Sequence, residues 1–247
     1  SAPNCPLKVA RSVPRPPPSS GNLRVLYEDN HLIAVWKPPG VLTQGDASGE
    51  PSLMDWVKRW LAERYHKPGN VFLGLIHRLD RPVSGVLLFA KTSKAASRLS
   101  QQFRERSVEK HYLACVEGAL TPPHGRLAHF IAHTEGSRSV RVSNAAHTGA
   151  KSASLRYDTR WTDASVSILD VELETGRKHQ IRAQLAHVGH PIVGDRLYGA
   201  RRSGDSAAIA LCSVSLAFTH PITKQPLTIE LPPALLPPAL RHGCRSE

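Results

Sequence analysis

The chain has 247 residues, 40% of them hydrophobic, so it is long enough and apolar enough to bury a core as one large or two small domains. Lys and Arg outnumber Asp and Glu by 32 to 20, and the net charge of +12 favours a nucleic acid or another polyanion as partner. No run of roughly 18 apolar residues predicts a membrane span, and the N-terminus lacks the apolar core of a signal peptide, so we expect a cytoplasmic protein that is not secreted.

The first part of the chain is rich in proline and leads into a hairpin signal. Residues 1–21 hold six prolines and several cations without apolar periodicity, which predicts a disordered basic tail before a globular domain over residues 22–247. Two β-type runs, residues 24–27 and 32–35, bracket a polar turn and predict a hairpin. Strand character ends at the KPPG segment, residues 37–40.

Two helices are predicted next. Ser52 is a good N-cap for a helix with apolar residues at 3.6-residue spacing, which we interpret as a core-facing stripe. Ser93 is expected to cap a second helix with Leu99 and Phe103 on one side and four cations elsewhere. The sequence leaves open whether that basic face is only solvated or touches phosphates.

Further strands are predicted at residues 112–116, 154–157, 166–174, 209–217 and 227–231. Many strands with only about three helices favour an α+β fold on a largely antiparallel sheet. Residues 121–150 are expected to be loop-rich, because glycines and prolines recur there. A proline-rich stretch at residues 231–238 is expected to close the fold, and the last ~12 residues to form a frayed tail.

The spacing of cysteines and histidines predicts no metal site. None of the four cysteines forms the Cys-x-x-Cys pair that zinc and redox sites use, so we expect reduced thiols. His129 with His133 and His187 with His190 have tolerable ligand spacings. Neither pair has the glutamate of a zincin motif or a third ligand nearby in sequence.

One carboxylate stands between two arginines in the segment HRLDRPVSG, residues 77–85. Proline and glycine in this segment predict a turn, and the apolar run at residues 86–90 predicts a strand that follows it. Guanidinium groups a few ångströms away favour the ionised form of a carboxylate, so Asp80 is a candidate nucleophile or base at the mouth of a sheet. Taken alone, the segment is more typical of a structural salt bridge in a loop.

A second basic segment, TGRKHQIRAQL at residues 175–185, is predicted to follow a strand and begin a helix. Free backbone N–H groups and the dipole at a helix N-terminus attract anions. Lys178 and Arg182 would lie four residues apart on one helical face, and Ile181 with Leu185 on another. The segment therefore suits a phosphate backbone or a buried carboxylate, with an ordinary solvated helix as the alternative.

Five short elements, in this order, resemble the RluA-type pseudouridine synthases, which isomerise uridine to pseudouridine in structured RNA. They are KPPG at residues 37–40, HRLDRPVSG at 77–85, KHYLA at 110–114, TGRKHQIR at 175–182 and GHPIVGDRLYG at 189–199. Any one element is weak, but the five cover most of the globular region. The resemblance implies the pseudouridine synthase catalytic fold, an α+β fold with its active-site cleft across the sheet, and it implies no cofactor.

The resemblance assigns the chemistry to three residues. Asp80 is implied as the catalytic aspartate, Arg182 as the partner that keeps it ionised and oriented, and Tyr112 as the residue that stacks near the uracil and assists proton removal from C5. Leu79 and Ile181 are implied as apolar walls that exclude water from the base. Three routes stay open for a carboxylate: attack on C1′, addition to C6, or removal of the C2′ proton.

The implied partner is RNA, either rRNA or tRNA, and we expect a monomer. A uridine in folded RNA must be extruded at a cost on the order of a few kcal/mol, and Arg78 is implied to fill the vacated space or to grip the flipped nucleotide. Arg81 and Lys37 are expected at flanking phosphates, and Arg177 and Lys178 near the RNA.

The sequence departs from the family pattern in three ways. Val83 and Lys178 stand where many members have Thr, which removes one hydroxyl contact and adds one charge near the RNA. No S4-type RNA-binding domain is expected before the catalytic region, so substrate choice would rest on the catalytic domain, helped by the basic tail.

Two other functions are consistent with part of this pattern. One is a non-catalytic RNA-binding or chaperone module on the same fold, against which the intact Asp80, Tyr112 and Arg182 argue. The other is an N-glycosidase with a lone aspartate, which would need to trap water at C1′ and has no second carboxylate near Asp80 in sequence.

Overall fold

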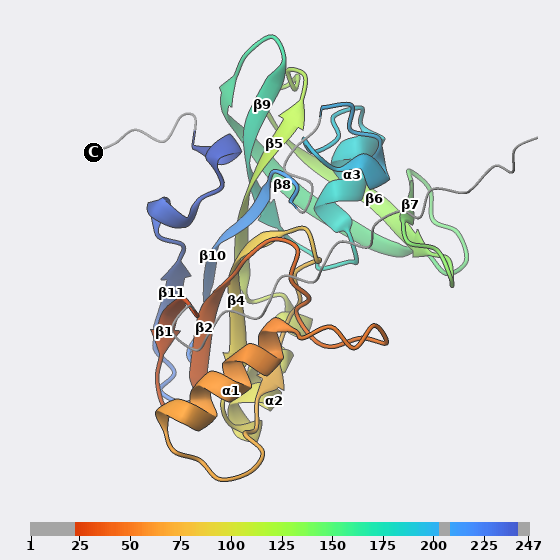
Figure 1. Ribbon diagram of the computed structural model, residues 1–247. Helices are drawn as coiled ribbons and strands as arrows, with labels where there is room; N and C mark the ends of the chain where they lie inside the picture. Colours follow the sequence, from red (N-terminus) through yellow and green to blue (C-terminus); the bar gives the residue numbers. More distant parts are fainter. Residues whose placement is uncertain (1–22, 203–207, 242–247) are drawn as a thin grey trace, which may run out of the picture.

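The computed structural model describes residues 23–202 and 208–241, which build one mixed β-sheet with three α-helices (Figure 1). The predicted tail, residues 1–21, lies outside the described residues. Within the described ranges, no helix has the length and apolar character that a membrane span requires.

Eleven strands form the sheet in the order β1-β2-β4-β10-β5-β9-β8-β6-β7, with β3 pairing on β4 and β11 on β10. The strands are β1 (Val25–Glu28), β2 (Leu32–Lys37), β3 (Gly74–Leu75), β4 (Ser84–Ala90), β5 (Glu109–Glu117), β6 (His124–His133), β7 (Val140–Ser143), β8 (Lys151–Thr162), β9 (Val166–Leu173), β10 (Leu211–Thr219) and β11 (Pro226–Glu230). Among these strands, only β4 and β10 pair in parallel. The prediction of an α+β fold on a largely antiparallel sheet is therefore confirmed, as is the β1–β2 hairpin.

The helices are α1 (Leu53–Arg64), α2 (Ser93–Glu105) and α3 (Gln180–His187). Ser52 caps α1 as predicted, in a capping box with Asp55. The cap of α2 is Thr92 rather than Ser93, because the Thr92 hydroxyl already accepts the backbone N–H of Ala95 from an extended backbone. Figure 1 shows α1 and α2 beside the β2–β4 part of the sheet and α3 over β6 and β7.

Two expectations about loops and ends are wrong in part, because strands or 3₁₀ turns occupy part of each segment, and residues 242–247 lie outside the described residues. Residues 121–150 contain β6 and β7, which lacked a clear strand signal because most β6 side chains are exposed or only half-buried. β6 is held by its pairing with β8 and β7. The supposed frayed tail begins with Leu236 and Leu240, which are 8% and 0% exposed, because short 3₁₀ turns at Pro233–Leu235 and Pro238–Leu240 fold them onto the core.

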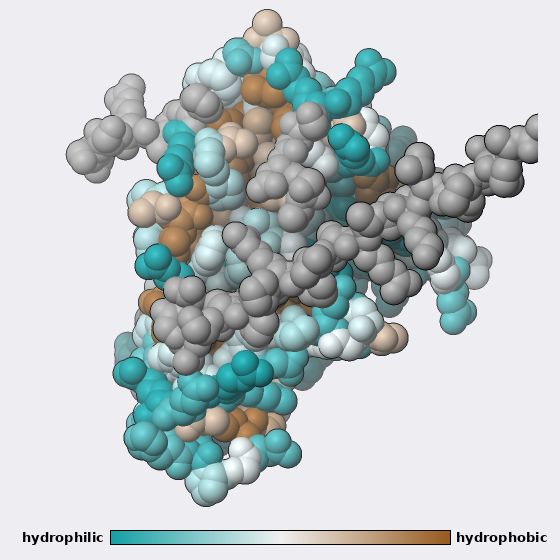
Figure 2. Space-filling model, in the orientation of Figure 1, coloured by the Kyte–Doolittle hydropathy of each residue, from teal (hydrophilic) through white to brown (hydrophobic). Residues whose placement is uncertain are grey.

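The core follows the central strands. All seven residues of β4 are buried, as the uninterrupted apolar run from Val86 to Ala90 predicts. In Figure 2, hydrophilic side chains cover most of the lower part of one face, and hydrophobic side chains show there only in small patches. The start of β4, next to β10, is where the two halves of the sheet meet and where the loop with Asp80 enters.

Gly85→Ala should destabilise the fold strongly. A Cβ at this position would lie 2.2 Å from the backbone oxygen of Ser213, at a φ of +123° that other residues rarely adopt. We expect the free energy of unfolding to fall by more than about 3 kcal/mol. Gly49→Ala is the control, because Gly49 has a φ of +71° but no atom within 4 Å, so the loss should be about 1 kcal/mol. Urea denaturation measures both, and equal losses would contradict this packing argument.

Candidate active site

A cleft of about 1080 Å³ crosses the sheet where its two halves meet. Its walls are the loop around Asp80, the C-terminal part of α2, the start of β5 and residues 173–182. Its charged lining residues are the cations Arg78, Arg81, Arg104, Arg106, Lys110, Arg177, Lys178 and Arg182 and the carboxylates Asp46 and Asp80. Such an excess of cations in a concave site attracts a polyanion.

The loop before β4 holds Asp80 in place through its backbone. The hydroxyl of Thr43 donates to the carbonyl oxygen of Leu79 at 2.8 Å and accepts from the Leu79 N–H at 3.3 Å. The N–H of Val83 donates to the carbonyl oxygen of Asp80 at 3.0 Å, which closes the predicted turn. Leu79 belongs to the same loop, is buried, and lines the cleft beside Asp80. The carboxylate thus stands on a loop whose backbone is fixed on both sides.

Lys37 supports the same loop from below. Its side chain is fully buried, and the ammonium donates to the carbonyl oxygens of Pro38, Arg81 and Val83 at 3.1, 3.0 and 2.7 Å. The expected contact of Lys37 with an RNA phosphate is wrong for this structure, because the ammonium does not reach solvent. Burial lowers the pKa of Lys37 to about 7, although the nearby charge of Asp80 opposes that shift.

Arg182 links two carboxylates. Its Nη1 donates to Oδ2 of Asp80 at 3.0 Å, which confirms the pairing predicted from the sequence. Its Nε and Nη2 donate to the two oxygens of Asp195 at 2.6 and 2.9 Å. The side chains of Arg182 and Asp195 are 5% and 2% exposed, whereas that of Asp80 is 28% exposed and faces the cleft. Burial disfavours the charged guanidinium, but the two carboxylates outweigh it and raise the pKa of Arg182.

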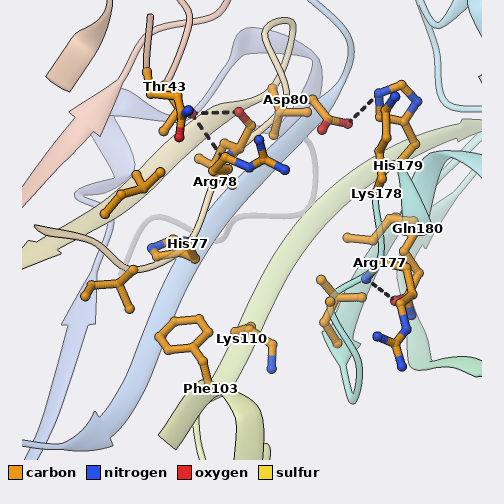
Figure 3. A pocket seen from close by; sticks show the side chains of 18 of the residues that line it. Thr43, His77, Arg78, Asp80, Phe103, Lys110, Arg177, Lys178, His179 and Gln180 are labelled. Carbon is orange, nitrogen blue, oxygen red and sulfur yellow. Dashed lines mark hydrogen bonds and ion pairs between the residues drawn. The ribbon is translucent and has the colours of Figure 1, made fainter. Parts of the chain in front are cut away.

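His179 approaches the same oxygen of Asp80 (Figure 3). Its Nε2 lies 3.7 Å from Oδ2 of Asp80, and its Nδ1 forms a 2.9 Å hydrogen bond with the hydroxyl of Tyr198. His179 has a left-handed backbone, with φ 55°, so α3 begins only at Gln180. Lys178 therefore precedes the helix, and the expectation that Lys178 and Arg182 share a helical face is wrong. In the described part of the chain no hydrogen bond reaches Oδ1 of Asp80, so that oxygen is not engaged by the described protein groups.

Tyr112 lines the cleft from β5. It is 6% exposed, and burial with the nearby charge of Asp80 raises the pKa of its hydroxyl. Ile181, which is 4% exposed, lines the cleft from α3, as Leu79 does from the loop. The structure therefore brings Asp80, Tyr112, Arg182 and both apolar residues together around one cavity.

The remaining predicted RNA contacts lie on the cleft walls. Arg78 is exposed and makes no ion pair with any described carboxylate, so its guanidinium is available to a ligand. Arg81 instead pairs with Glu50 at 2.7 Å and donates to the carbonyl oxygen of Gly40 at 3.0 Å. On the opposite wall, Arg177 donates to the carbonyl oxygen of Ser152, and the Lys178 ammonium lies 2.7 Å from Nε2 of His133.

Several site residues were missed from sequence. Asp195 and Tyr198 lie in the family element GHPIVGDRLYG, and their membership of that element was the signal that could have identified them. Thr43 carried no such signal, because a threonine in a loop does not show in the sequence which group its hydroxyl binds. Arg104 and Arg106 belong to the basic side of the second helix, whose role the sequence left open, and they line the cleft with Lys110 of β5. Across the described residues, no three side chains of His, Cys, Asp or Glu gather into a metal-binding cluster.

Comparison with known proteins points to one family. Residues 31–187 match the family model described as RNA pseudouridylate synthase. An uncharacterized RNA pseudouridine synthase, YhcT, of Bacillus subtilis is 32% identical over 235 residues, covering 93% of this chain and 74% of the relative. The tRNA pseudouridine synthase C of Salmonella typhi is 34% identical over 229 residues, covering 84% of each chain. The ribosomal large subunit pseudouridine synthase C of Vibrio vulnificus is 33% identical over 214 residues, covering 84% of this chain and 65% of the relative.

Solved structures share the fold. Human RNA Pseudouridylate Synthase Domain Containing 4 superposes with a TM-score of 0.73 at 21% identity, covering 89% of this chain and 91% of that one. Human RNA Pseudouridylate Synthase Domain Containing 1 gives a TM-score of 0.68 at 24% identity, covering 92% and 89%.

The burial of Lys37 predicts a pH dependence of stability. A lysine pKa of about 7 in the folded protein lies below that of an unfolded chain, so unfolding takes up a proton between these values and stability rises with pH above 7. Lys37→Met removes this contribution. The free energy of unfolding of the wild type, minus that of the variant, should therefore rise with pH from about 7 to 9, by up to ~1.4 kcal/mol per pH unit. Urea denaturation at several pH values measures it, and a constant difference would contradict the assignment.

Proposed function

The chain belongs to the RNA pseudouridylate synthase family, and on that premise we propose that it converts a uridine of rRNA or tRNA to pseudouridine with Asp80 as the catalytic carboxylate. The observation that carries the proposal is the 3.0 Å contact between Asp80 and Arg182 in a strongly basic cleft. It combines an oriented carboxylate with a surface suited to a polyanion.

The reaction needs few protein groups. The bond from N1 to C1′ breaks, the uracil turns, C5 bonds to C1′, the C5 proton leaves and N1 takes up a proton. The isomerisation involves no net oxidation or reduction, and no second substrate enters. A single carboxylate can serve as nucleophile at C1′ or at C6, or as base at C2′, and these three routes stay open.

The geometry suggests which carboxylate oxygen acts. Oδ2 of Asp80 is engaged by Arg182 at 3.0 Å and approached by His179 at 3.7 Å. Oδ1 is the oxygen that we assign to the reacting atoms. Arg182 limits the rotation of the carboxylate, and Asp195 fixes Arg182 in turn.

The uracil would lie between apolar walls. Leu79 and Ile181 exclude water from the base, and Tyr112 stacks on or near it and assists removal of the C5 proton. A deprotonated Tyr112 is disfavoured by burial and by Asp80, so we assign its hydroxyl to a relay of the proton rather than to a standing phenolate.

The RNA must open before Asp80 can reach a sugar. The exposed guanidinium of Arg78, which pairs with no described carboxylate, is suited to occupy the space of a flipped nucleotide or to hold its phosphate. Arg177 and Lys178 lie across the cleft for flanking phosphates. We propose that the protein acts as a monomer in the cytoplasm, where rRNA and tRNA are its candidate substrates.

Asp80→Asn should abolish turnover while leaving RNA binding in place. RNA tritiated at uracil C5, including unmodified rRNA and tRNA, is incubated with each protein, and release of tritium reports bond formation at C5. We expect release by the wild type and a rate more than about a thousandfold lower for Asp80→Asn, because the amide retains the shape but not the charge.

The same assay separates the alternatives. RNA binding without tritium release by the wild type would favour a non-catalytic RNA-binding module. Free uracil would identify a glycosidase. Equal release by wild type and Asp80→Asn would exclude Asp80 as the catalytic residue.

A further inference from the structure

The end of the cleft beside α2 contains a second group of cations that the reaction does not use. Arg104 and Arg106 come from the C-terminal end of α2, and Lys110 comes from β5. Figure 3 shows Lys110 and Phe103 on the other side of the pocket from His179, next to His77. The rings of His77 and Phe103 stack with their centroids 5.2 Å apart and 16° between their planes, so packed rings line this end of the cleft.

Lys110 is a buried ammonium with spare donors. It is 8% exposed, and its ammonium donates one hydrogen bond, to the carbonyl oxygen of Val108 at 3.0 Å. No described carboxylate forms an ion pair with it, although Glu172 acts on it from a distance. Desolvation lowers its pKa, and Arg106 adds to that shift. A buried cation that lines a cleft and lacks an anionic partner is stabilised when an anion binds there.

Arg106 occupies a backbone conformation that favours glycine. It ends α2 with φ 59° and ψ 30°, where a side chain is strained and glycine is the usual residue. Its side chain nevertheless lines the cleft, is exposed and forms no ion pair with the described carboxylates. The guanidinium of Arg106 is therefore available to a ligand.

Helix electrostatics explains only part of this group. Cations near the C-terminus of a helix are favoured by its dipole, so Arg104 and Arg106 would be stabilised there without any ligand. Lys110 lies on a strand and gains nothing from that dipole. All three cations line the same cleft as Tyr112, and none of them forms an ion pair with a described carboxylate.

We propose that Lys110 and Arg106 bind a phosphodiester of the RNA strand next to the target nucleotide. Lys110 and Tyr112 are two residues apart on β5, so their side chains share a face and stand about 7 Å apart. A phosphate beside the nucleotide at Tyr112 is therefore within reach. This assignment rests on the proposed function, because that function places the target nucleotide at Tyr112. Lys110 and Arg106 would bind the RNA without touching the atoms that react.

Arg106→Gly tests the proposal, with Lys224→Gly as matched control. Lys224 is also an exposed cation with positive φ, 65°, but it lies in the turn between β10 and β11, away from the cleft. Both changes remove one charge and relieve the same backbone strain, so both proteins should melt at the wild-type temperature or above it. Only Arg106→Gly should weaken RNA binding, and Lys110→Gln should weaken it in the same way.

Binding is measured by fluorescence anisotropy with a labelled oligouridylate of about 12 nucleotides. We expect each cleft variant to bind about tenfold more weakly at low salt. For each cleft variant, the affinity at about 50 mM salt divided by that at about 200 mM should be about threefold smaller than for the wild type, because one phosphate contact is lost. Arg106→Lys should restore most of this salt dependence.

Equal effects of Arg106→Gly and Lys224→Gly would overturn the proposal, because binding would then follow net charge alone. Unchanged salt dependence in Lys110→Gln would overturn the role of Lys110. The binding assay needs no turnover, so a failure here is distinct from a wild type that releases no tritium.

Discussion

The guanidinium of Arg182 joins two carboxylates from separate parts of the chain, and the candidate active site is organised around it. Asp195 accepts hydrogen bonds from Nε and Nη2 of Arg182 in a buried ion pair. Nη1 of Arg182 is left to donate to Asp80 at the edge of the cleft. A buried guanidinium needs such partners, since removal of one typically costs about 3–5 kcal/mol. The interaction that stabilises α3 against the GDRLYG segment is thus also the one that orients the candidate catalytic carboxylate.

The fold brings the parts of this site from both halves of the sheet. The Asp80 loop enters β4 in one half, whereas Tyr112 and Arg182 belong to β5 and α3 in the other. The loop is fixed by Lys37 below and Thr43 beside it, so little freedom is left to the backbone of Asp80. The cations are arranged outside this fixed centre, on walls that suit a flexible polyanion.

The sequence predicted the centre of the site better than its surroundings. Asp80, Tyr112 and Arg182 were predicted to share one site because a family motif marks each of them, and the structure places them around one cleft. Lys37 was misassigned because a lysine beside two prolines does not show whether it is solvated or buried under a loop. The start of α3 was misplaced because helical spacing continues through His179, whereas its backbone is left-handed. β6 was missed because its pairing partners, not its own apolar residues, hold it in the sheet.

We propose that Asp195 acts on catalysis through Arg182, whose guanidinium it holds in place. The most direct test is a double-mutant cycle on the single-turnover rate of tritium release, with Asp195→Asn, Arg182→Gln and the double variant. If Asp195 works through Arg182, the double variant should be no slower than Arg182→Gln alone, within about threefold. Rate losses that multiply in the double variant would show independent roles and would contradict the account.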